Sequence, residues 1–245
     1  MKSLKIYTIG MIMLLLLTGV VIVSCTKSFD EKTVQQKDFN NSTLAQVFVA
    51  TVNASRNYVY VDGNPVTGAV LASGSVFPTT AYSFNVPGGL RAFTIRDTLR
   101  TSTQLPLVFA ENMEVGKNYT IFAYDTITSP KQITVPTSIE VPSDNSCRLR
   151  FANFIYAPFA LPSVDVFSFN KNANLFTDIP VTGVTDFVSY PSGLSSDTLY
   201  IRETGTMNLV YKLGIIGGLT SKRSYTFVYR GSHRGVRTSS LFANY

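Results

Sequence analysis

The chain has 245 residues, of which 45% are hydrophobic and 15% are charged, and its formal net charge is +6. This charged fraction lies below the roughly 25% that is usual for soluble domains, which excludes intrinsic disorder as a description of the whole chain. One His and two Cys exclude the ordinary ligand sets of a zinc site and a disulfide framework. The length allows one large domain or two domains of about 100–120 residues.

The first 24 residues have the layout of a secretory signal peptide. Lys2 and Lys5 form a short basic region, and residues 6–23 are mostly apolar. Because the apolar run is long enough to cross a bilayer, a retained transmembrane helix is the alternative interpretation. The polar segment that follows carries no basic stop-transfer cluster, which favours cleavage.

The end of this segment, Ile22-Val23-Ser24-Cys25, resembles the lipobox of bacterial lipoproteins. In that family the Cys thiol takes diacylglycerol before the signal peptide is cleaved. The resemblance therefore implies that residues 1–24 are removed and that Cys25 becomes the acylated first residue. Each buried CH₂ of its acyl chains would contribute about 0.8 kcal/mol to membrane anchoring. Cleavage leaves 19 basic and 15 acidic residues, a net charge of +4 that is too mild to indicate nucleic-acid binding.

A polar segment, residues 25–44, follows the expected cleavage site. Its Lys, Gln, Asn, Asp and Glu content predicts a flexible tether between the lipidated Cys25 and the folded part. Its start, Ser28-Phe29-Asp30-Glu31, resembles the acidic patch of surface-exported lipoproteins of the Bacteroidota. This resemblance implies a lipid anchor in the outer membrane at the cell surface, with the periplasmic face as the alternative.

Beyond the tether the sequence repeats itself in three blocks, which keep the same order and a nearly constant offset. They are residues 86–90 with 190–194, 113–124 with 219–230, and 58–62 with 163–167, at offsets of 104, 106 and 105. Such internal repetition predicts two tandem domains, which we place at residues 45–140 and 147–245.

Both copies carry the pattern of antiparallel β-structure. Tyr119, Ile121 and Ala123 alternate with Thr120, Phe122 and Tyr124, which gives a period of two. Turn residues recur every 8–12 positions. No convincing helix follows residue 26. The sequence therefore predicts an all-β fold of two immunoglobulin-like antiparallel β-sandwich domains.

One further pattern supports the sandwich prediction. Met113 precedes Tyr119 by six residues, and Leu219 precedes Tyr225 by the same distance. An apolar residue, a short turn and a Tyr at a strand start resemble the tyrosine corner of immunoglobulin-like sandwiches. We expect each Tyr hydroxyl to bond backward to the main chain, in preference to a role in stacking on a ligand.

The second copy is similar to a known bacterial family. Residues 148–153, Arg-Leu-Arg-Phe-Ala-Asn, and 163–167, Ser-Val-Asp-Val-Phe, resemble the opening of the domain of unknown function 4397 family, and residues 190–194 and 224–228 resemble its later blocks. The first copy departs from the pattern, because residues 45–51 lack the Arg and Tyr60 stands where the first Asp would fall. Two copies would cover residues 45–245. The resemblance implies secretion and this fold, and no activity.

The sequence contains no pattern typical of an enzyme. His233 is the one His, and its Gly-bounded loop predicts a solvated turn rather than a catalytic base. Nucleophile-elbow, EF-hand and phosphate-loop motifs are absent, and the carboxylates form no recognisable glycosidase pair. We expect no catalytic residue, cofactor or metal. Cys147 is expected to be a small buried residue at a strand start.

One cluster of basic residues is a candidate site for an anionic ligand. Acidic glycan, lipopolysaccharide phosphate or an acidic partner could bind it, and the alternative is an ordinary set of solvent-facing strand and loop ends. It comprises Lys222, Arg223, Arg230, Arg234 and Arg237, interleaved with Tyr225, Phe227 and Tyr229.

Together these features predict a non-catalytic outer-membrane lipoprotein that is a binding or accessory module for a cell-envelope protein complex or a glycan. The absence of Trp favours a protein partner, because Trp gives the largest stacking face for sugars. The alternative is a structural spacer or adhesin-like stalk. An exposed apolar surface would favour a protein partner, coplanar exposed Tyr rings a glycan, and neither a spacer.

Overall fold

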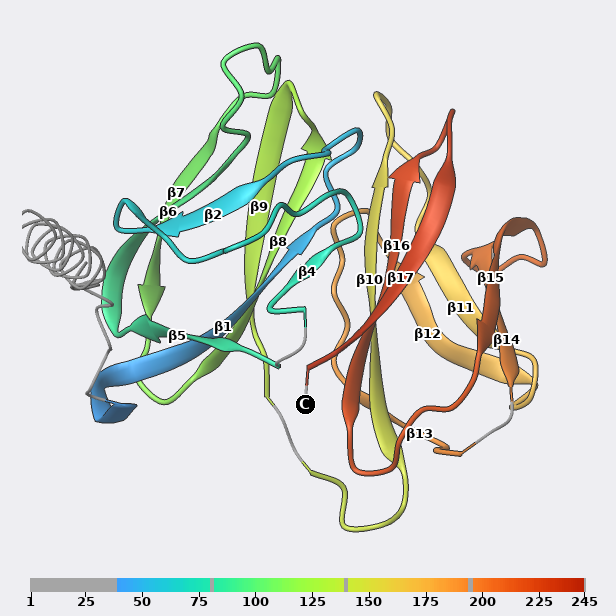
Figure 1. Ribbon diagram of the computed structural model, residues 1–245. Coiled ribbons are helices and arrows are strands. Elements are labelled where there is room, and N and C mark those ends of the chain that lie inside the picture. The colour runs from blue at the N-terminus through green and yellow to red at the C-terminus, as the bar shows by residue number, and fades with distance from the viewer. Residues whose placement is uncertain (1–38, 80–81, 139–140, 194–195, 245) are drawn as a thin grey trace, which may run out of the picture. The chain divides into compact units, whose positions relative to one another are not determined.

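The computed structural model describes residues 39–79, 82–138, 141–193 and 196–244 (Figure 1). The expected signal peptide, Cys25 and most of the expected tether lie outside the described residues. Asp38–Tyr245 form one compact unit. Its described residues form strands, irregular connections and one turn of 3₁₀ helix, η1 (Phe39–Asn41), and no α-helix, which confirms the all-β fold class. No helix in the described ranges is long and apolar enough to cross a membrane.

The first half of this unit, residues 42–136, consists of two sheets. One has the strand order β4-β1-β8-β9, with β5 also paired to β1, and the other has the order β3-β2-β6-β7. The strands are β1 (Ser42–Val49), β2 (Tyr58–Val61), β3 (Asn64–Pro65), β4 (Val76–Phe77), β5 (Phe84–Pro87), β6 (Gly89–Arg96), β7 (Leu107–Met113), β8 (Asn118–Thr126) and β9 (Ser129–Pro136).

The second half, residues 147–243, repeats this arrangement. Its sheets have the orders β13-β10-β16-β17 and β12-β11-β14-β15. The strands are β10 (Cys147–Tyr156), β11 (Val164–Ser168), β12 (Ala173–Ile179), β13 (Val188–Tyr190), β14 (Asp197–Glu203), β15 (Leu209–Ile216), β16 (Ser224–Ser232) and β17 (Arg237–Ala243).

Each half contains one parallel strand pair, which differs from the purely antiparallel expectation. In the first half β1 pairs with β8, with Ala45 opposite Tyr119, and in the second β10 pairs with β16, with Leu149 opposite Tyr225. The chain leaves the first strand, builds the other sheet, and returns to the first sheet in the same direction. A parallel partner is therefore the result of a crossover connection.

Each half has its own core between its two sheets. Val47, Phe93 and Ile121 are fully buried in the first half, as are Phe151 and Ile201 in the second. These residues occupy the inward positions of strands whose neighbouring residues point away, as the period-two pattern requires. Two stacked sheets around one apolar layer make each half a β-sandwich.

Both predicted tyrosine corners are confirmed. The hydroxyl of Tyr119 accepts a hydrogen bond of 3.3 Å from the backbone N–H of Glu114. The hydroxyl of Tyr225 accepts one of 3.1 Å from the backbone N–H of Thr220. Each ring thus fixes the crossover that precedes the long strand on which it lies.

The first strand begins earlier than the expected end of the tether at residue 44. Residues 42–44 lie in β1, and Thr43 is fully buried while its hydroxyl donates to the carbonyl of Lys117 at 2.7 Å. Because the polar side chain of Thr43 has a backbone partner, its polarity does not indicate a flexible segment. Residues 42–44 belong to the fold.

The two halves share a third apolar layer, which we call the seam. It joins the outward face of the β4-β1-β8-β9 sheet to that of the β13-β10-β16-β17 sheet. Consequently the central strands β1, β8, β10 and β16 are covered on both faces. The buried members of the seam are Phe48, Ala50, Phe122, Ala152, Phe154, Val228 and Phe242.

Candidate functional site

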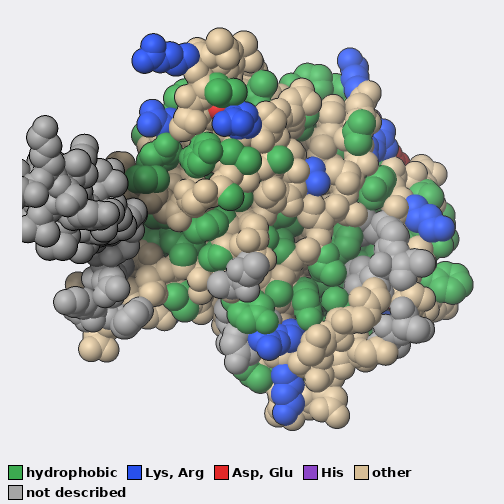
Figure 2. Space-filling view, viewed as in Figure 1, with side chains coloured by type: hydrophobic (Ala, Val, Ile, Leu, Met, Phe, Trp, Pro, Cys, Tyr) green, Lys and Arg blue, Asp and Glu red, His purple; other side chains and the backbone are tan. Residues whose placement is uncertain are grey.

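The five basic residues singled out in the sequence do not meet in one patch. Lys222 and Arg223 precede β16, Arg230 lies near its far end, and Arg234 and Arg237 belong to the turn and to the start of β17. Seven residues of extended strand separate Arg223 from Arg230 by about 23 Å along the backbone. On the face that Figure 2 shows, Lys and Arg side chains lie in separate groups.

Two of these arginines are used to hold the protein together. Arg230 donates from Nε to Ser240 Oγ at 2.9 Å and from Nη1 to Ser73 Oγ, in the other half, at 3.1 Å. Arg237 donates from Nε and Nη2 to the carbonyl of His233, at 3.0 and 2.8 Å. Both guanidinium groups therefore have internal acceptors.

Arg234, Arg223 and the aromatic residues of this cluster also make contacts within the protein. Arg234 lies 4.8 Å from the ring centroid of Phe159, and Arg223 lies 5.0 Å from that of Tyr82. His233 is half-buried with its ring edge-on to Phe159 at 5.6 Å, so it is less solvated than we expected. Phe227 and Tyr229 between the cations point into the core of the second half.

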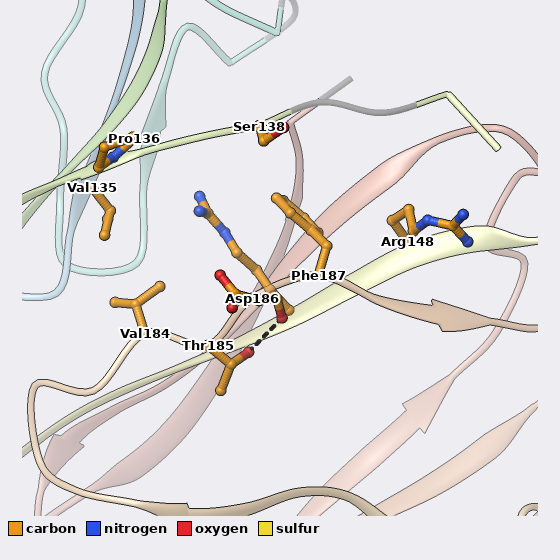
Figure 3. A pocket seen from close by; sticks show the side chains of 9 residues that line it. Val135, Pro136, Ser138, Arg148, Val184, Thr185, Asp186 and Phe187 are labelled. Carbon is orange, nitrogen blue, oxygen red and sulfur yellow. Dashed lines mark hydrogen bonds between the residues drawn. The ribbon is translucent and has the colours of Figure 1, made fainter.

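The seam contains a cavity of about 430 Å³ that residues of both halves line, which we call the seam cavity (Figure 3). Val135 and Pro136 face it from the first half, and Asp186 and Phe187 lie side by side on the opposite wall. The lining residues are Val135, Pro136, Ser138, Arg148, Arg150, Val184, Thr185, Asp186 and Phe187.

A buried arginine lines this cavity. Arg150 is 2% exposed, and its Nε donates to Thr226 Oγ1 of the neighbouring strand at 2.7 Å. Its Nη2 reaches across the seam and donates to Thr120 Oγ1 at 2.8 Å and Thr137 Oγ1 at 3.3 Å. The guanidinium carbon lies 4.8 Å from the ring centroid of Phe187, a cation–π contact.

The strand β10 explains how an arginine comes to lie there. Leu149 and Phe151 point into the core of the second half, so the alternating residues Arg148, Arg150 and Ala152 point toward the seam. Arg148 has a different partner from Arg150. Its Nη1 donates to Ser146 Oγ at 3.1 Å, and its side chain lies on the far side of Phe187 in Figure 3.

The charge of Arg150 is not balanced by an ion pair. Burial lowers the pKa of its guanidinium to about 9, and the nearby carboxylate of Asp186 opposes this shift. The ion pairs of the described ranges join Arg56 to Asp97, Arg91 to Asp62 and Lys131 to Asp125, and none includes Arg150. Its Nη1 forms no hydrogen bond to a described residue, whereas Nε and Nη2 are both satisfied.

This arrangement can bind an anion. A buried charge that forms no ion pair carries a desolvation cost, and an anionic acceptor that receives a hydrogen bond from Nη1 would offset part of this cost. Sequence analysis mentioned Arg150 within a family resemblance and assigned it no role. The signal available in the sequence was an arginine between Leu149 and Phe151 in a largely apolar stretch, residues 149–156.

The structure offers little for other chemistry. Among the described residues, no group of three or more His, Cys, Asp or Glu side chains could hold a metal ion. Cys147 is fully buried at the start of β10, as predicted, and its thiol donates to the carbonyl of Tyr190 at 3.3 Å. Burial raises the pKa of that thiol to about 11, which keeps it protonated and unreactive.

Comparison with known proteins adds no family. Neither a scan of the chain against models of protein families nor a search of curated proteins finds a match.

Proposed function

We propose that the protein is a non-catalytic, lipid-anchored binding module of the bacterial outer membrane and that it holds its ligand in the seam cavity. The observation that carries this proposal is the buried guanidinium of Arg150, which forms no ion pair and leaves Nη1 without a hydrogen bond to a described residue, on the wall of a cavity of about 430 Å³. Cavities of this size are typical of small-ligand sites, and a few placed polar groups in an apolar wall fix a ligand's orientation.

The anchoring part of the proposal depends on the sequence. Residues 1–24 act as a signal peptide, Cys25 carries the acyl chains, and the tether that follows places the folded unit at the cell surface. The likeness to the domain of unknown function 4397 family remains part of this proposal, as two copies in residues 45–245. Neither catalysis nor nucleic-acid binding belongs to it.

The outer sheets favour a protein complex over a glycan as the larger partner. On the β3-β2-β6-β7 sheet, Leu90 and Val108 are 71% and 67% exposed on the outward face. The neighbouring Tyr60 ring is covered by Arg96, whose guanidinium carbon lies 4.8 Å from its centroid. In the second half Arg202 covers Phe167 at 4.0 Å in the same way. Covered rings offer sugars less flat surface for stacking.

A photo-crosslinking residue placed at the cavity tests this proposal. The full-length lipidated protein would carry it at Ser138, which is exposed and lines the seam cavity, or at Thr98 as a control in the exposed loop after β6. We expect a discrete crosslinked product in cell membranes from position 138 and none from position 98. A spacer, the alternative function, would give no discrete product from either position.

A further inference from the structure

The polar groups of the seam cavity define which ligand it can accept. Nε and Nη2 of Arg150 are committed to Thr226, Thr120 and Thr137, so the guanidinium cannot turn a two-pronged edge toward a ligand. The Nη1 amino group is left to donate to one oxygen atom. A singly charged group with an exposed oxygen matches this better than a phosphate, which needs several donors.

The remaining wall of the cavity has an apolar side and a polar side, and Ser138, Arg148, Thr185 and Asp186 form the polar one. Val135, Pro136, Val184 and the ring of Phe187 face the space, and the hydroxyl of Thr185 is already donated to the carbonyl of Asp186 at 2.9 Å. A sugar would need hydrogen-bond partners for hydroxyl groups on every side, and the apolar side supplies none. A ligand with an apolar body can pack against this side while its polar end faces Arg150.

The acidic neighbour limits the ligand charge. Asp186 lies on the same wall and its field acts on Arg150. One added negative charge next to one buried cation and one carboxylate is acceptable, whereas a dianion would be repelled by Asp186.

We propose that the seam cavity binds a monocarboxylate carried on a compact apolar body, with the carboxylate accepting from Nη1 of Arg150 and the body packed against Phe187, Val184 and Pro136. This inference rests on the proposed binding function and adds the ligand class. A free organic acid and the carboxyl end of a peptide share this chemistry.

Binding of defined probes to the folded protein tests the inference. The probes are N-acetyl-phenylalanine, its amide as the matched uncharged control, phenylacetate, glucuronate and inorganic phosphate, each titrated by calorimetry. We expect both apolar carboxylates to bind at least tenfold more tightly than the amide, glucuronate and phosphate. A higher affinity for N-acetyl-phenylalanine would indicate a peptide end, and a higher affinity for phenylacetate a free acid.

Two substitutions assign the effect to one residue. Arg150→Met keeps the length of the side chain and removes the charge, and we expect it to weaken carboxylate binding at least tenfold. Arg202→Met is the control, because Arg202 lies on β14 in the other sheet with its guanidinium carbon 4.0 Å from the ring centroid of Phe167, and it should change the affinity less than threefold. Because Arg150 also bridges the halves, Arg150→Lys is the second variant, which keeps a cation and should retain part of the affinity.

The outcomes separate this inference from the proposed function. Equal binding of N-acetyl-phenylalanine and its amide, or an affinity unchanged by Arg150→Met in a folded variant, would overturn the carboxylate assignment. If glucuronate or phosphate bound best, the ligand class would be wrong while a binding function stood. A crosslinked partner at Ser138 together with no binding of any probe would likewise refute the inference alone.

Discussion

Phe48 of β1 and Phe242 of β17 stack across the seam, with ring centroids 5.2 Å apart and ring planes 18° apart. Phe48 belongs to the first half and Phe242 to the second, and both are buried. Phe122 extends the cluster, with its centroid 4.8 Å from that of Phe154. The halves are thus joined by a packed aromatic layer in addition to the chain connection.

The first prediction concerns this layer. Phe242→Ala should lower the free energy of unfolding by about 3 kcal/mol, because it removes a buried ring and leaves a cavity in the seam. It should also split one calorimetric transition into two, since the cores of the halves are separate while the seam couples them. The control is Phe169→Ala, whose ring is 63% exposed and which should change stability by less than about 0.5 kcal/mol. Equal effects of both variants would contradict the coupling role of the seam.

The sequence predicted the sandwiches better than the seam. Period-two alternation around Ile121 identifies one buried face of β8, and the structure places Tyr119, Ile121 and Ala123 on it. The same alternation leaves Phe122 on the other face, where sequence alone cannot distinguish a solvent-facing ring from one that packs on a second sheet. The seam therefore depends on three-dimensional pairing of the halves that no local pattern encodes.

The candidate site shows the same limit. Arg223 and Arg237 are close in sequence, but an extended strand and a hairpin separate them in space, so residues that are clustered in the sequence are not clustered on the surface.

The offset between the two copies of the repeat also changes locally. Arg96 covers Tyr60 and Arg202 covers Phe167, and this pairing aligns β2 with β11 at an offset of 107, two more than the sequence block indicated.

The second prediction concerns the tyrosine corners. Tyr119→Phe removes the hydroxyl that accepts from Glu114, and Tyr225→Phe removes the one that accepts from Thr220. Each should lower the free energy of unfolding by about 1 kcal/mol, the net value of one such hydrogen bond. Denaturant titration measures this, with Tyr58→Phe on an outward face of β2 as the control. Losses no larger than that of the control would show that the corners add no stability.

The third prediction concerns acid sensitivity of the second half. Burial alone would raise the pKa of Asp197, but hydrogen bonds from Ser168, Tyr190 and the backbone hold it below its usual value of 3.8. A depressed folded-state pKa means that the ionised carboxylate stabilises the fold above the usual pKa, and that this stability is lost as the pH falls through the folded value.

Asp197→Asn should therefore lower stability at pH 7 by about 2 kcal/mol, because the donors around it lose a charged acceptor. The gap between the variant and the unaltered protein should shrink when the pH is taken below about 4. Asp178→Asn, at an exposed side chain, is the matched control and should be nearly neutral throughout. A gap that stays constant with pH would exclude ionisation of Asp197 as its source.

The last prediction concerns a glycine at the end of β16. Gly231 has a φ of 104°, which L side chains rarely adopt, and a Cβ there would collide with the backbone carbonyl oxygen of Val236. Gly205 has a φ of 73° but open space around a Cβ built there, so its substitution shows the cost of a left-handed dihedral angle without a collision. Gly205→Ala should cost about 1 kcal/mol of unfolding free energy and Gly231→Ala at least about 3 kcal/mol.

The difference between the two variants combines the collision with the less accessible φ of Gly231, because both positions have a positive φ but that of Gly231 is larger. Gly231 pairs with Arg237 in the β16–β17 hairpin, and relief of the collision would move the turn that Arg237 holds through the carbonyl of His233. We therefore expect Gly231→Ala also to increase hydrogen exchange at β17, where Phe242 enters the seam. Equal costs for the two alanine variants would mean that the hairpin yields freely and does not hold that strand in place.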